Sequence, residues 1–165
     1  MRIGITGHQR LKEPSSWKWV SSELNSLLAQ LESPLIGITS LAIGADQLFA
    51  NAILRHGGSL EAVLPFTGYE NTFSAGHDRQ EYTRLLNSAS KVEILEKRGS
   101  DEEAYLEAGK RVIDLSDILV AVWDGKPAAG LGGTGDAVNY ALQTQRKVIH
   151  LNPVTHKVIE QSGEA

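Results

Sequence analysis

The order of apolar and amphipathic segments predicts an α/β fold, a single doubly wound domain whose mostly parallel sheet is flanked by helices. Short apolar runs alternate with longer stretches of helical periodicity along the whole 165-residue chain. Some runs, such as residues 118–122, are apolar at every position, which is typical of a parallel strand covered on both faces. No internal repeat or domain-scale linker interrupts this alternation, so we expect one domain over residues 1–153.

The expected strands are short apolar runs that end at glycine, proline or polar turn residues. They cover residues 2–6, 35–39, 60–64, 92–95, 118–123 and 147–151. The expected helices have apolar residues at spacings of three and four, or begin at a capping residue. They cover residues 14–31, 44–56, 78–88, 101–115 and 136–143. Residues 154–165, after the last strand, are expected to form a polar C-terminal tail.

Composition excludes several classes of site. The chain has no cysteine and its histidines show no metal-ligand spacing, so we expect no metal and no cofactor. Its 16 basic and 20 acidic residues give a net charge of −4, which disfavours binding to nucleic acid. The N-terminal residues lack the apolar run of a signal peptide, and no segment resembles a membrane span. We therefore expect a soluble cytoplasmic protein that does not contact a membrane.

Glycine residues gather where a ligand site is expected. Open parallel sheets bind ligands beyond the carboxyl ends of their strands, at the point where the strand order reverses. The chain has 16 glycines, about 10% of its residues against a usual ~7%. Half of them fall at the ends of expected strands or in the loops just beyond: Gly7, Gly44, Gly68, Gly125, Gly130, Gly132, Gly133 and Gly135. The surplus therefore predicts a binding site at this edge of the sheet.

The segment from Gly130 to Asp136 is the sharpest signal for a ligand. It follows a buried strand and leads directly into a helix. Its glycines let backbone amides approach a ligand, and the helix adds unsatisfied N–H groups and the positive end of its dipole. This pattern predicts a phosphate loop. The alternative is a flexible surface loop in which Thr134 or Asp136 caps the helix.

A second strand-to-helix turn, from Ser40 to Asp46, offers a carboxylate. One hypothesis is that Asp46 accepts a hydrogen bond from a ribose hydroxyl or from the facing loop. The other is that it only interacts favourably with the helix dipole. Tyr69 is predicted to stack on a base at the rim of the site, and Arg79 either meets a phosphate or lies on a solvated helix face.

These segments resemble the SLOG superfamily, the Rossmann-like fold shared by LOG (lysine-decarboxylase-like) proteins, the DNA-processing protein DprA and YpsA-type proteins. Residues 5–8 (Ile-Thr-Gly-His) resemble the YpsA-like branch, and residues 40–46 resemble the Ser-Gly-x-Ala-x-Gly-x-Asp turn of the DprA branch. Residues 132–134 (Gly-Gly-Thr) resemble the LOG phosphate loop, and residues 114–153 are also similar to nucleoside 2-deoxyribosyltransferases. The resemblance implies a nucleotide ligand and a homo-oligomer, for which Trp19 is a candidate contact.

One departure from these families bears on catalysis. In LOG and deoxyribosyltransferase patterns, a glutamate stands three positions after Gly-Thr and serves N-glycosidic chemistry. Here Ala137 occupies that position and Asp136 precedes it by one residue, a rotation of about 100° on a helix. The DprA-like turn also has Ile43 in place of its arginine. The sequence therefore leaves open whether the protein is an enzyme.

We predict that the protein binds a nucleotide or nucleotide-derived ligand, as a sensor or carrier. One alternative is a hydrolase or transferase that cleaves the N-glycosidic bond of a nucleoside or nucleoside 5′-monophosphate; another is a DprA-like DNA-binding module. The catalytic candidates are Asp136, Asp46 and Glu70, with His8 and His77 as candidate proton carriers. The predicted ligand-binding residues are Gly7, His8, Ser40, Gly44, Asp46, Pro65, Tyr69, Arg79, Asp124, Gly125, Gly132, Gly133, Thr134, Gly135 and Asp136.

Overall fold

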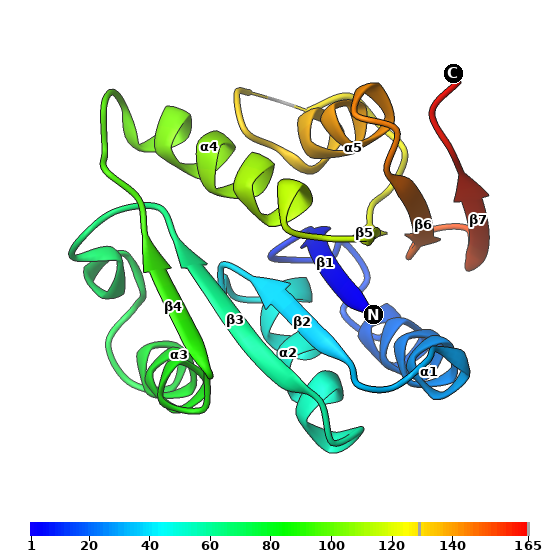
Figure 1. Ribbon diagram of the computed structural model, residues 1–165, viewed down its shortest axis with the longest axis horizontal. Helices are drawn as coiled ribbons and strands as arrows, with labels where there is room; N and C mark the ends of the chain where they lie inside the picture. Colours follow the sequence, from blue (N-terminus) through cyan, green and yellow to red (C-terminus); the bar gives the residue numbers. More distant parts are fainter. Residues whose placement is uncertain (129, 165) are drawn as a thin grey trace.

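The computed structural model describes residues 1–128 and 130–164, whose strands form one sheet in the order β4-β3-β2-β1-β5-β6-β7 (Figure 1). Neighbouring strands are parallel except at the antiparallel β6–β7 edge. The strands are β1 (Arg2–Gly7), β2 (Ile36–Thr39), β3 (Ser59–Leu64), β4 (Lys91–Ile94), β5 (Ile118–Val122), β6 (Lys147–Asn152) and β7 (Lys157–Gln161). The predicted fold class is confirmed: the domain is doubly wound and Rossmann-like.

The helices cover both faces of this sheet. They are α1 (Ser16–Gln30), α2 (Ala45–Arg55), the short 3₁₀ helix η1 (Tyr69–Thr72), α3 (His77–Asn87), α4 (Asp101–Asp114) and α5 (Thr134–Gln143). Helices α1, α2 and α3 lie on one face, and α4 and α5 lie on the other (Figure 1). Among the described residues, no helix is both long and apolar enough to cross a membrane.

The core follows the patterns that predict these elements. All five residues of β5 are buried, as its continuous apolar run predicts. On α1, Val20, Leu24 and Leu28 are buried at intervals of four residues and form the face that packs on the sheet. Each such side chain stabilises the fold by about 1.5–3 kcal/mol. The result is a rigid sheet that holds the loops at its carboxyl edge in place.

The C-terminal residues differ from the expected polar tail. Residues 157–161 form β7, which pairs with β6 in a register that places Glu160 opposite Ile149. The turn before β7 brings His156 onto Trp19, with ring centroids 4.8 Å apart and the planes nearly parallel. The sequence did not predict this strand because its side chains are mostly exposed and its pairing comes from backbone hydrogen bonds. Trp19 thus has a partner within its own chain.

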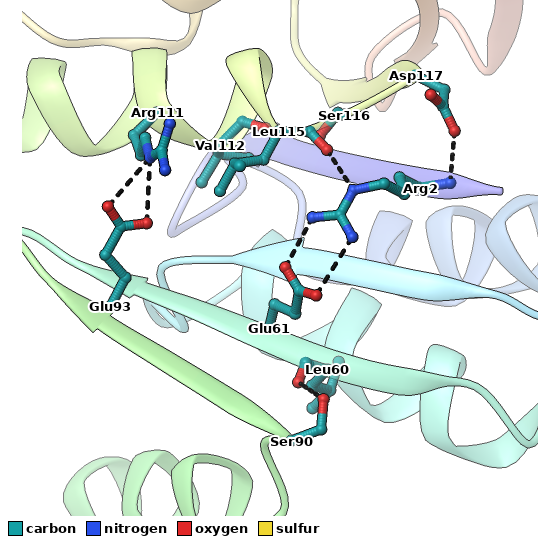
Figure 2. A network of polar contacts seen from close by, with 10 residues as sticks. All are labelled: Arg2, Leu60, Glu61, Ser90, Glu93, Arg111, Val112, Leu115, Ser116 and Asp117. Atoms are coloured by element: carbon teal, nitrogen blue, oxygen red, sulfur yellow. Dashed lines mark hydrogen bonds and ion pairs between the residues drawn. The ribbon is translucent and has the colours of Figure 1, made fainter.

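A polar network ties the amino ends of the central strands together (Figure 2). Arg2 reaches across β2 and donates two hydrogen bonds to Glu61, at 3.2 and 2.7 Å, while its Nε donates to the carbonyl of Leu115. Its backbone amide donates to Asp117 at 2.8 Å. The hydrogen bonds from Arg2 hold the pKa of Glu61 below its ordinary value. Because Arg2 and Asp117 lie at the amino ends of β1 and β5, this network leaves the opposite edge free for a site.

Candidate functional site

A cavity of about 840 Å³ opens at the carboxyl ends of β1 and β5. These two strands mark the switch point of the sheet, because β2 to β4 extend from one side of β1 while β5 to β7 extend from the other. The cavity walls come from the segments that follow β1, β2, β3 and β5, and from one side of α4. This is the position at which open α/β sheets bind ligands.

Most of the predicted ligand-binding residues line this single cavity. The segments that carry them are far apart in the sequence, and the parallel strands bring them to one edge of the sheet. Those that line the cavity are Gly7, His8, Ser40, Asp46, Pro65, Tyr69, Asp124, Gly132, Gly133, Thr134 and Gly135. Their contact with a ligand stays a prediction.

Gly44 does not line the cavity and has a packing role. Its backbone has a φ of +82°, and a Cβ atom built on it would lie 2.4 Å from the carbonyl oxygen of Gln9. The next amide, that of Ala45, donates a hydrogen bond to the carbonyl of His8. Gly44 therefore lets the turn before α2 contact the loop after β1 directly.

Four other predicted residues also lie outside the cavity lining. Arg79 donates a hydrogen bond to the carbonyl of Phe73 at 3.1 Å, so it holds a loop. Glu70 is an exposed residue of η1, and Gly125 forms a turn with a φ of +83°. Asp136 accepts a hydrogen bond from the amide of Gly132 at 2.9 Å, so its carboxylate stabilises the conformation of the glycine loop.

The segment after β5 is held by a chain of short polar contacts. The indole Nε1 of Trp123 donates to the carbonyl of Lys126 at 2.8 Å, and the amide of Lys126 donates to Asp124 at 2.9 Å. The imidazole of the buried His150 lies 2.7 Å from the carbonyl of Trp123. Asp124 in turn donates its amide to Nε2 of His8. These contacts hold residues 123–126, the first part of the loop that leads to α5.

The N-terminus of α5 places backbone amides at the cavity wall. The amides of Asp136 and Ala137 bond back to the carbonyl of Gly133. Within the described residues, the amides of Thr134 and Gly135 have no acceptor, as is usual in the first turn of an α-helix. Both residues line the cavity, together with the cationic side chains of Arg10 and Lys126. This arrangement can bind an anion.

Asp46, in the first turn of α2, also lines the cavity. Its carboxylate accepts a hydrogen bond from the amide of Ala42 at 3.3 Å. Burial nevertheless raises the pKa of Asp46 to about 7, outweighing the contacts with Ala42, Thr39 and Ser40. A carboxyl group in this state can give or take a proton near neutral pH.

Aromatic residues also contribute to the cavity lining. Tyr69, the predicted stacking residue, is almost fully buried and packs edge-on against Phe73 and Tyr82. Burial and the nearby Asp46 raise the pKa of the Tyr69 hydroxyl. Tyr105 of α4 also lines the cavity and is 37% exposed, so it is better placed than Tyr69 to meet a planar ligand group. Tyr105 lies on a helix and not at a strand end, so its sequence position does not mark it as a site residue.

Similarity to solved structures is clear at the level of the fold. DNA processing protein A from Streptococcus pneumoniae superposes with a TM-score of 0.64 over 90% of this chain at 15% sequence identity. DNA processing protein A from Helicobacter pylori, described for its single-stranded DNA binding mode, gives a TM-score of 0.63 over 91% at 16% identity. The chain therefore shares the fold of these two proteins. It spans 49% and 64% of the length of these two proteins.

The same fold is also seen in a protein that carries a cofactor. The molybdenum cofactor carrier protein from Chlamydomonas reinhardtii gives a TM-score of 0.54 over 92% of this chain at 16% identity, and the match covers 75% of that protein. No protein-family model matches the sequence, and no curated protein sequence is similar to it. The solved structures therefore establish the fold, and the site must be interpreted from its own residues.

Proposed function

We propose that this protein binds a nucleotide or nucleotide-derived ligand, as a sensor or carrier, with a phosphate group at the N-terminus of α5. The observation that carries the proposal is that the amides of Thr134 and Gly135, in the wall of a cavity at the switch point, have no acceptor within residues 1–128 and 130–164. Backbone amides at a helix N-terminus are well suited to a phosphate, because they add hydrogen bonds to the favourable field of the dipole.

The size and charge of the cavity support the same ligand class. A volume of about 840 Å³ lies within the usual range of ~300–1,000 Å³ for small-molecule sites and leaves room for more than a phosphate. Arg10 and Lys126 add positive charge to the cavity lining, and Tyr105 adds an aromatic side chain. The molybdenum cofactor carrier shows that this fold is used by a carrier protein.

Position 134 allows a test that removes an amide without disturbing the helix. Thr134 is the first residue of α5, where proline is favourable, and Gly133 has the extended ψ of 174° that a residue before proline requires. We expect Thr134→Pro to fold normally and to weaken nucleotide binding about tenfold or more, because one hydrogen bond to the phosphate is lost. Thr134→Ala is the matched control, since it removes the hydroxyl and keeps the amide.

Binding is measured by thermal shift and isothermal titration with AMP, GMP, CMP, UMP and their diphosphates. A rise in Tm with at least one of these, lost in Thr134→Pro and kept in Thr134→Ala, is the expected result. The absence of any shift in the wild-type protein would overturn the proposal. Equal affinity of Thr134→Pro and wild type would show that the phosphate lies elsewhere.

A second candidate function is cleavage of an N-glycosidic bond, and Asp46 is the residue that favours it. This carboxyl group lines the cavity with a pKa of about 7, so it can act as a proton donor at neutral pH. Its test is chromatography for free base after incubation with each nucleoside monophosphate. Base release by the wild type and its loss in Asp46→Asn would replace binding by catalysis as the function.

Binding of DNA is the least supported reading. The cavity lining includes the carboxylates of Asp46, Asp78 and Asp124 beside its two basic residues, and the whole chain has a net charge of −4. A DNA-binding module requires affinity for a single strand that falls steeply with salt concentration. We expect a salt-titrated binding assay to show no such affinity. The homo-oligomer implied by the resemblance likewise stays a prediction, to be checked by light scattering.

A further inference from the structure

Gly109 is a glycine of α4 whose presence the protein's own packing does not explain. It lies inside the helix Asp101–Asp114, where glycine destabilises the helical state more than any residue except proline. Its φ is not in the left-handed region, so another residue can adopt the same backbone conformation. Apart from its chain neighbours and the backbone of its own helix, a Cβ atom at this position would meet no atom of the described residues within 4 Å. Alanine would therefore fit the fold and stabilise it.

Other glycines of the cavity wall differ from Gly109 in this respect. A Cβ atom at Gly7 would lie 2.5 Å from Cβ of Ala45, and one at Gly133 would lie 2.8 Å from Cβ of Ala128. Packing within the protein excludes side chains at these two positions. The open space at Gly109 belongs to the cavity, because Gly109 lines it together with Tyr105, Leu106 and Ala108.

We propose that Gly109 is a specificity-determining residue that admits the sugar of the bound nucleotide against the backbone of α4. This inference rests on the proposed function, which places the phosphate at the N-terminus of α5. The space beside Gly109 is then filled by the ligand, and a side chain there would compete with it.

The position of Gly109 relative to the glycine loop identifies the sugar. The loop contacts α4 at Gly132, where a Cβ atom would lie 3.3 Å from the amide nitrogen of Leu106. Gly109 follows Leu106 by three residues, which places it about 4.5 Å further along the helix axis and on the same side of α4. The group that lies next to the phosphate in any nucleotide is the sugar. The phosphate itself is held by the loop and is not expected to contact Gly109.

The test uses Gly109→Ala and Gly109→Leu in the whole protein, with Glu107→Leu on the exposed side of the same helix as the control. We expect Gly109→Ala to raise Tm by about 2–6 °C, because a helix-interior glycine is removed. We expect the same variant to weaken binding of the AMP, GMP, CMP and UMP panel at least fivefold, and Gly109→Leu at least fiftyfold. Inorganic phosphate, titrated by phosphorus NMR, should bind all variants equally.

The outcomes separate this inference from the function on which it rests. If the wild type binds no nucleotide of the panel, the proposed function is overturned and this inference with it. If the wild type binds and both Gly109 variants bind equally well, only the role of Gly109 is overturned. A fall in Tm for Gly109→Ala would show that the protein itself fills the space, and would also overturn it.

Discussion

The backbone amide of Asp124 donates a hydrogen bond to Nε2 of His8 over 3.1 Å and so joins the ends of the two strands that flank the switch point. The carboxylate of Asp124 lies 3.6 Å from the same nitrogen. His8 thus links the ends of β1 and β5 at the border of the cavity.

Replacing His8 by alanine removes this link. We expect His8→Ala to lower the free energy of unfolding by about 1 kcal/mol, because the Asp124 amide loses its acceptor. Nucleotide affinity should fall as well, since both residues line the cavity. Urea unfolding and titration calorimetry measure the two effects. His77→Ala, at an exposed position outside the cavity, is the control and should change neither.

Asp46 predicts a pH dependence of stability. Its pKa in the folded protein is about 7, above the ordinary value of 3.8, so the folded state holds a proton that the unfolded state releases. The contribution of this group to stability is therefore full below about pH 4 and is lost as the pH rises to about 7. The loss is at most about 4 kcal/mol. Asp46→Asn should be insensitive to this change, and parallel curves for the two proteins would refute the prediction.

The ion pair of Arg2 and Glu61 predicts an effect on stability alone. We expect Arg2→Met to cost about 1–2 kcal/mol, because Glu61 and the Leu115 carbonyl lose their donors. The lowered pKa of Glu61 means that its contribution is present above its ordinary pKa of 4.5 and is lost as the pH falls below that value. Denaturant unfolding at pH 7 and pH 4 should thus show a smaller difference between variant and wild type at pH 4. Arg98→Met, which removes an exposed ion pair with Glu96, should have no effect.

Asp136 predicts a difference between two substitutions. Asp136→Asn keeps an oxygen that can accept from the Gly132 amide, whereas Asp136→Ala does not. We expect nucleotide affinity to change less than about twofold in the first variant and to fall about tenfold in the second. Calorimetric titration measures both. Equal damage by the two substitutions would indicate that the negative charge of Asp136, and not its bracing hydrogen bond, is what the site requires.

The sequence predicts the strands and helices well where apolar side chains define them. The continuous apolar run of β5 predicts a strand buried on both faces, and the four-residue spacing of Val20, Leu24 and Leu28 predicts a helix with one buried face. Strand β7 was missed because its side chains are mostly exposed and only its backbone hydrogen bonds hold it. Turn η1 was missed for a similar reason, since it depends on local backbone contacts.

The sequence also locates most of the cavity, because glycine and polar residues after parallel strands must meet at one edge of the sheet. The sequence does not reveal the structural role of each residue at this edge. Gly44 and Gly132 both carry a positive φ in a loop, yet one packs against a neighbouring loop and the other lines the cavity. Tyr105 and Gly109 lie on a helix whose pattern indicates only an amphipathic face. Their place in the cavity wall depends on how this helix packs over the sheet.

The pairing of β1 with β5 has a consequence for how the chain folds. The contact between Arg2 and Asp117 joins residues 115 positions apart, and the same long loop separates the two halves of the cavity. Closing such a loop is slow, so the central pair of strands is expected to form late. In a nascent chain whose β5 has not yet emerged from the ribosome, β1 therefore lacks one of its two neighbouring strands. A ligand present in the cell would stabilise only those chains in which β1 and β5 have already paired.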